Sequence, residues 1–99
     1  MRRLKIMIVC GFGVGSSMVL KFTLDGILKE ENITDVETFC SDSFVASGEN
    51  YDIVFTSKEL DYLFERNRQP RVVIKNFISK DEVREKGLEP IRKLLNEMK

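Results

Sequence analysis

The sequence predicts an α/β fold: a three-layer sandwich in which a small parallel sheet is covered on both faces. Three observations indicate this fold. Short apolar runs alternate with longer segments of helical period along the 99 residues. The first run, Leu4–Val9, is rich in branched side chains and is stopped by glycines, as expected of a strand buried on both faces. The connections between runs are long enough for right-handed βαβ crossovers, which build parallel sheets.

The individual elements follow from the apolar period and from start and stop signals. Four segments are predicted strands: Leu4–Val9, Val36–Phe39, Asp52–Thr56 and Val72–Ile74. Three segments are predicted helices: Ser17 to about Glu31, Ser57 to about Asn67, and Ser79 to about Met98. The segment 40–50 has no clear period, which leaves a loop or a poorly formed helix. Residues 1–99 are predicted to form a single domain.

Capping and breaking residues set the expected helix ends. Asn32 is a stop signal for the first helix, and Ser57 is expected to cap the second. Ser79 and Glu82 have the spacing of a capping box at the start of the last helix. Two residues are expected to break or kink that helix: Gly87 and Pro90.

Charge and composition narrow the function. Sixteen basic and sixteen acidic residues give no formal net charge, so no bulk attraction draws the chain to nucleic acid or to an acidic membrane. Two distant cysteines make no disulfide framework, and Leu4–Val9 is too short to span a membrane, so we expect a reduced cytoplasmic protein. Histidine is absent, which removes the commonest general base and metal ligand. We therefore expect no metal and no cofactor.

The stretch "CGFGVGSS", Cys10 to Ser17, carries the chemistry. Alternating glycines let successive backbone N–H groups point inward, and such a nest at the start of a helix binds an anion. A cysteine at its first position makes that anion a thiolate or a phosphoryl group on sulfur, so Cys10 is the candidate nucleophile. The candidate phosphate-binding residues follow it: Gly11, Phe12, Gly13, Val14, Gly15, Ser16 and Ser17.

Other glycine-loop motifs fit this stretch poorly. A dinucleotide-binding loop needs a glycine where Ser16 stands, and an NTPase phosphate loop needs a lysine. A low-molecular-weight tyrosine phosphatase or an arsenate reductase of that kind needs an arginine at the position of Ser16 and an Asp-Pro pair, and the sequence has neither. Hydrolysis should then be poor, whereas transfer between two phosphoryl carriers remains possible.

The stretch "KIMIVCGFGVGSSMVLK", Lys5 to Lys21, resembles the EIIB components of the bacterial phosphoenolpyruvate-dependent sugar phosphotransferase system (PTS). The resemblance favours the ascorbate type, with the galactitol and lactose/cellobiose types as relatives. It implies a flavodoxin-like sheet in the order 2-1-3-4. It also implies a phosphocysteine transferase, in which Cys10 takes phosphoryl from an EIIA phosphohistidine and passes it to a sugar bound by EIIC. We accordingly expect a cytoplasmic protein that reaches the inner face of the membrane through EIIC. We expect it to bind no nucleic acid and not to insert into the membrane itself.

Two other functions stay open. A thiol enzyme, either phosphatase or reductase, would release inorganic phosphate or require a Cys10–Cys40 disulfide. The second open function is that of a regulatory module, because similar domains occur fused to transcriptional antiterminators. Cys40 is otherwise expected to be buried and inert. Thr56 and Ser57 end a strand on the same edge as Cys10, where they contact the phosphoryl group or, for Ser57, cap a helix.

Surface residues complete the predicted site. On a helix of ideal period, four residues share an arc that faces the sheet: Leu20, Leu24, Ile27 and Leu28. Four other apolar residues surround Cys10 as a docking patch for EIIA and EIIC, unless the C-terminal helix covers part of it: Phe12, Val14, Met18 and Phe22. Three arginines are expected at the opposite, amino-terminal edge of the sheet, where water solvates them: Arg66, Arg68 and Arg71.

Overall fold

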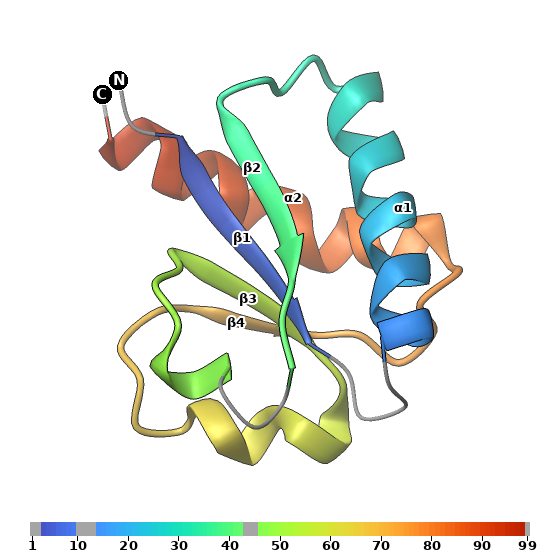
Figure 1. The fold of residues 1–99 in the computed structure, drawn as a ribbon. Helices are drawn as coiled ribbons and strands as arrows, with labels where there is room; N and C mark the ends of the chain where they lie inside the picture. The colour runs from blue at the N-terminus through green and yellow to red at the C-terminus, as the bar shows by residue number, and fades with distance from the viewer. Residues whose placement is uncertain (1–2, 10–13, 43–45, 99) are drawn as a thin grey trace.

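The computed structural model describes residues 3–9, 14–42 and 46–98. Its elements in chain order are β1 (Leu4–Val9), α1 (Val14–Glu30), β2 (Val36–Cys40), the 3₁₀ helix η1 (Ala46–Gly48), β3 (Ile53–Thr56), the 3₁₀ helix η2 (Lys58–Phe64), β4 (Arg71–Val73) and α2 (Lys80–Glu97). The strands form a four-stranded sheet in the order β2-β1-β3-β4, and every pair is parallel (Figure 1). The predicted fold class and strand order are confirmed.

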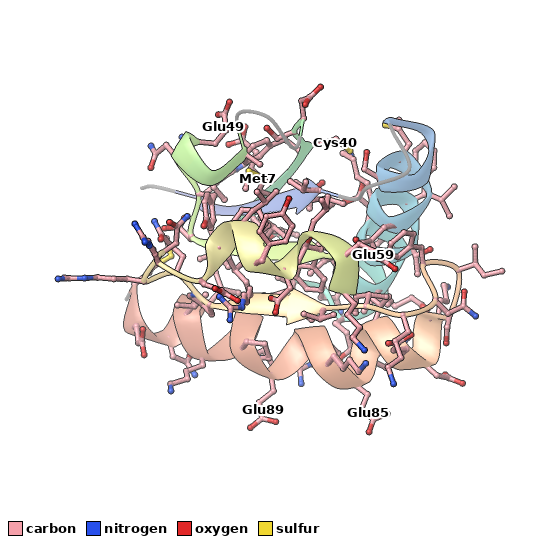
Figure 2. The ribbon with its side chains drawn as sticks, turned by 90° about the horizontal axis from the view of Figure 1, so that it is seen from below. Met7, Cys40, Glu49, Glu59, Glu85 and Glu89 are labelled. Atoms are coloured by element: carbon pink, nitrogen blue, oxygen red, sulfur yellow. The ribbon has the colours of Figure 1, made fainter. Side chains whose placement is uncertain are left out.

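The sheet separates two apolar layers. Alternate side chains of β1, among them Ile6 and Ile8, lie in a core shared with α1 and α2. Met7 and Val9 point the other way, into a smaller core that contains residues of η1 and η2. Figure 2 shows Met7 on the side of the sheet away from α2. The α-helices therefore cover one face and the 3₁₀ helices the other, because side chains alternate along a strand.

The first helix starts earlier than the sequence predicts and ends where predicted. It begins at Val14 rather than Ser17, so its first turn includes the last glycine of the loop, Gly15. At its other end Asn32 has a φ of 56°, a left-handed conformation that asparagine tolerates. The amide of Ile33 donates to the carbonyl of Leu28 at 2.9 Å, and that of Asn32 to Lys29, which is a Schellman motif. Asn32 is thus confirmed as the stop.

The second predicted helix is a 3₁₀ helix, and Ser57 does not cap it. The Ser57 backbone is extended, and its side chain makes no capping hydrogen bond to η2. The Leu60 amide instead donates to the Ser57 carbonyl at 3.2 Å, the i to i+3 spacing of a tight turn. This turn buries Phe64 against the sheet. The predicted cap is therefore wrong, because tertiary burial of the segment replaces local capping.

The last helix forms half of the predicted capping box. The Ser79 side chain accepts a hydrogen bond from the Glu82 amide at 3.2 Å, as predicted. The Glu82 carboxylate turns instead to the preceding loop, where it accepts from the amides of Lys75 and Asn76 at 2.8 Å each. Glu82 therefore holds the connection between β4 and α2.

The predicted break in the last helix does not occur. Helix α2 runs from Lys80 to Glu97 through both Gly87 and Pro90. A Cβ atom added at Gly87 would lie 2.6 Å from Cζ of Phe55, a ring that is fully buried in β3. Gly87 therefore allows α2 to approach the sheet closely, and it does not end the helix. Nothing in the structure explains why Pro90 is placed inside the helix.

Alanine at two helical glycines should have opposite effects on stability. Gly87→Ala forces a methyl group into the Phe55 ring and should lower the free energy of unfolding by about 1–3 kcal/mol. Gly26→Ala is the matched control, since its Cβ meets only the Lys80 side chain, at 3.7 Å. It should raise stability by up to about 1 kcal/mol through helix propensity. Urea denaturation measures both changes, and shifts of the same sign would contradict this account.

Glu82 should make stability depend on acid pH. Partial burial opposes its ionisation, but hydrogen bonds from Lys86 and from the amides of Lys75 and Asn76 outweigh burial and lower the pKa of Glu82 from 4.5 to about 2. A depressed folded pKa contributes stability above the unfolded value, and that contribution is lost as pH falls from about 4.5 toward 2.

Glu82→Gln should remove this contribution, so its stability curve should be flatter than wild type below pH about 4.5. Glu89→Gln is the control, because Glu89 projects outward from the same helix (Figure 2). Urea midpoints measured between pH 2 and 5 distinguish the variants. Equal acid dependence of Glu82→Gln and wild type would show that these hydrogen bonds do not stabilise the fold.

Candidate functional site

The carboxyl edge between β1 and β3 is where the connections separate. The connection after β1 leads to α1 on one face of the sheet, and that after β3 leads to η2 on the other. The two strands are neighbours (Figure 1), and their register pairs Val9 with Thr56 at this edge. In open parallel sheets, ligands bind in the crevice at such a switch point.

The flanks of the predicted anion cradle are in place. Cys10, Gly11, Phe12 and Gly13 lie outside the described residues. The strand before them ends at Val9 on the carboxyl edge, and the 17-residue helix α1 starts directly after them. The sequence-based order of strand, glycine loop and helix is therefore confirmed on both sides of the loop.

The start of α1 suits an anion. The backbones of Val14, Gly15 and Ser16 form its first turn, where amides have no carbonyl partner within the helix. This turn contains no acidic residue, and the helix dipole places partial positive charge there. Ser17 is buried inside the helix and is not its cap. The helix thus already includes Ser16 and Ser17, and their predicted role as phosphate ligands stays a prediction.

The end of β3 contributes two buried hydroxyl groups. Thr56 and Ser57 are 0% and 3% exposed. Neither Thr56 Oγ1 nor Ser57 Oγ has a hydrogen-bond partner in the described part of the chain. A buried hydroxyl without a partner costs about 1–3 kcal/mol. The placement of both residues on the Cys10 edge is confirmed, and the alternative in which Ser57 caps a helix is excluded.

Cys40 lies at the same edge but is only half-buried. It is the last residue of β2 and pairs with Ile8 of β1. Its Sγ lies 3.9 Å from Sδ of Met18, a weak sulfur contact on α1, and Figure 2 shows Cys40 close to this helix. The expectation of full burial is wrong, because β2 is an edge strand with one open side. Cys40 forms no disulfide within the described residues.

The outer surface of α1 is apolar near this edge. The predicted inward arc is confirmed, since Leu20, Leu24, Ile27 and Leu28 are all buried. Met18 and Phe22 are exposed, Phe22 by 64%, so α2 does not cover them. Nothing is described for the side chain of Val14 or for Phe12.

Two exposed apolar residues that the sequence analysis missed extend this surface. Val19 is 39% exposed on α1, and Ile78 is 73% exposed in the loop before α2. The loop is tied to α1 because Thr23 Oγ1 donates to the Phe77 carbonyl at 2.9 Å. Helical spacing from Phe22 could have identified Val19, whereas no local signal identifies Ile78. We call Met18, Val19, Phe22 and Ile78 the apolar patch.

The arginines lie away from this edge, as predicted. Arg71 begins β4 at the amino-terminal edge and pairs with Asp61 through Nε and Oδ1 at 2.6 Å. Arg66 and Arg68 are exposed in the segment before it. No group of three or more potential ligand side chains in the described ranges is placed to hold a metal. No helix within the described residues is long and apolar enough to cross a membrane.

These features define an α/β domain with a parallel sheet and a switch point at the carboxyl edge between β1 and β3. The chain belongs to the family described as the lactose/cellobiose-specific IIB subunit of the PTS, whose model matches residues 5–87. It is therefore a phosphotransferase component of a sugar-specific PTS, and such components work with EIIA and EIIC partners.

A solved structure shows the same fold. The lactose-specific IIB component domain of the phosphoenolpyruvate:carbohydrate phosphotransferase system from Streptococcus pneumoniae is 14% identical to this chain, with a TM-score of 0.56. The alignment covers 99% of this chain and 100% of that one. The comparison with curated proteins finds no significant match.

Proposed function

We propose that Cys10 carries the phosphoryl group between an EIIA phosphohistidine and a sugar bound by EIIC. One observation supports the proposal most directly: the cysteine and its glycines stand between the carboxyl end of a central strand and the start of α1. Amide nests and helix N-termini at this position stabilise a thiolate before transfer and a phosphoryl group after it. A buried, inert role for Cys10 would not explain why the cysteine stands at this position.

The two transfers conserve atoms and charge. In the first, the Cys10 thiolate attacks phosphorus, the S–P bond forms and the P–N bond breaks. The EIIA imidazole receives the electron pair of that bond and takes up a proton. In the second transfer, a sugar hydroxyl oxygen attacks phosphorus and loses its proton, the S–P bond breaks, and the sulfur leaves as a thiolate.

The site favours transfer over hydrolysis. No lysine or arginine lies between Cys10 and Lys21, and Ser16 stands where a phosphatase of this loop spacing has its arginine. Lys21 itself is engaged, since its Nζ donates to Asp25 Oδ2 at 2.8 Å. Within the loop, the oxygens of the phosphoryl group can therefore be held only by amides and hydroxyls, without a fixed cation.

We further propose L-ascorbate as the sugar and a cytoplasmic location at the inner membrane face, reached through EIIC. The support for ascorbate is the loop string from Cys10 to Ser17, while the matched family is described by lactose and cellobiose. Phosphorylation assays with EIIC vesicles and ascorbate, galactitol, lactose or cellobiose would compare these substrates directly. Phosphorylation of another sugar alone would reject ascorbate and retain the carrier.

Cys10 should be the sole phosphorylation site. Incubated with phosphoenolpyruvate, the general PTS proteins and EIIA, the wild-type protein should gain one phosphoryl group, because one thiol lies in the cradle. Cys10→Ser should gain none. Intact-protein mass spectrometry measures both.

Cys40→Ser is the matched control for this experiment. It removes the other thiol at the same edge, and it should retain labelling near the wild-type rate, since neither transfer needs a second sulfur. Undiminished labelling of Cys10→Ser, or phosphate on a serine of the wild type, would reject the mechanism. Equal loss of activity in both cysteine variants would favour a thiol reductase instead.

The apolar patch should be part of the EIIA docking surface. Phe22→Ser should slow phosphoryl arrival from EIIA about tenfold, because exposed aromatic anchors carry much of the binding energy in such interfaces. Tyr62→Ser is the matched control, with 63% exposure on η2 outside the patch. Rapid-quench labelling at low EIIA concentration compares the rates. Equal rates for wild type and Phe22→Ser would place docking elsewhere, and a loss of fold in Phe22→Ser would contradict its exposure.

A further inference from the structure

Ser57 is a buried hydroxyl that the fold leaves unused. Its side chain is 3% exposed, and Ser57 Oγ has no hydrogen-bond partner among the described residues. Ser57 stands at the N-cap position of η2, yet its side chain makes no capping bond. The local role that serine usually has at this position is therefore absent.

The register of the sheet places Ser57 at the edge from which the chain continues to Cys10. Val9 of β1 pairs with Thr56 of β3, so one step further along the two chains are Cys10 and Ser57. The backbone at Ser57 is still extended, with φ −92° and ψ 164°. Side chains along β3 therefore keep alternating through Ser57.

This alternation determines on which face of the sheet the Ser57 side chain lies. Ile53 and Phe55 lie in the core beneath α1 and α2, whereas Val54 lies in the core beside η1 and η2. Thr56 accordingly faces the 3₁₀ helices, and Ser57 faces the side where α1 begins. Ser57 thus lies on the same face of the sheet as the start of α1.

We infer that Ser57 is a side-chain ligand of the phosphoryl group, donating a hydrogen bond from its hydroxyl to a phosphoryl oxygen on phosphorylated Cys10. The inference rests on the proposed function and adds a residue from outside the glycine loop. The hydroxyl transfers no proton. It supplies a neutral donor where the loop contains no cation, and a hydrogen bond to an anionic oxygen is about twice as strong as one between neutral groups.

Thr56 provides a closely matched control for Ser57. Its hydroxyl is equally buried and equally unpartnered among the described residues, but it belongs to the opposite face of the sheet. Ser57→Ala should slow labelling of Cys10 by EIIA, and shorten the lifetime of the phosphorylated protein, each about tenfold. Thr56→Val should change both by less than about twofold, because alternation along β3 turns the Thr56 hydroxyl to the face of the 3₁₀ helices; of the two predicted contacts, the inference retains only Ser57.

Stability measurements test whether the role of Ser57 is merely structural. Since Ser57 Oγ lacks a partner, Ser57→Ala should leave the urea midpoint of the unphosphorylated protein unchanged or raised. Ser79→Ala is the comparison, because Ser79 does cap α2, and its midpoint should fall while labelling stays normal. A midpoint loss in Ser57→Ala as large as that in Ser79→Ala would overturn the inference.

The outcomes separate the inference from the proposed function. Absence of any label on wild-type Cys10 would reject the carrier and the inference together. Normal labelling of wild type with equally fast labelling and equal lifetime in Ser57→Ala would overturn the inference alone. Equal losses of labelling rate and lifetime in Ser57→Ala and Thr56→Val would also overturn the inference. A contact with the phosphoryl group should depend on one face of β3 and not on both.

Discussion

The parallel pairing of β1 with β3 is the interaction on which the site depends. It places Val9 beside Thr56, and the chain leaves these two residues toward opposite faces of the sheet. Divergent connections of this kind leave a crevice at the carboxyl edge of open parallel sheets. The first turn of α1 and the end of β3 stand on either side of that edge.

Contacts far from the loop hold this edge in position. Phe55 is fixed in β3 by the close approach of α2 at Gly87, and the orientation of Phe55 determines the face on which Ser57 emerges. At the neighbouring strand, Glu82 binds the amides of Lys75 and Asn76 and so holds the turn after β4. The fold thus orients the site through buried rings and a carboxylate that take no part in transfer.

Much of the fold could be predicted because its signals are local. The branched run of β1 and the left-handed Asn32 are each determined by a few neighbouring residues. The errors arose where distant contacts decide: the Phe55 ring explains Gly87, and burial of Phe64 replaces a cap at Ser57. For the site, the sequence predicted the carboxyl edge that the sheet topology shows, and the phosphate-binding loop residues stay a prediction. It could not decide between two roles for Ser57, since that choice depends on a hydrogen bond that only the structure tests.

The absence of a cation from the loop between Cys10 and Lys21 is consistent with a carrier that must both accept and release phosphoryl. A fixed guanidinium would stabilise the phosphorylated form and the transition state for attack by water alike, which suits a hydrolase. Amides and a hydroxyl stabilise the bound group less, so the S–P bond stays reactive toward the next acceptor. The exposed apolar patch beside the same edge is consistent with a second constraint, because a partner docked over Phe22 and Ile78 would exclude water from the edge. On this view, selectivity for transfer over hydrolysis comes from the partner that closes the site, and the chain itself needs only to hold the anion where that partner can reach it.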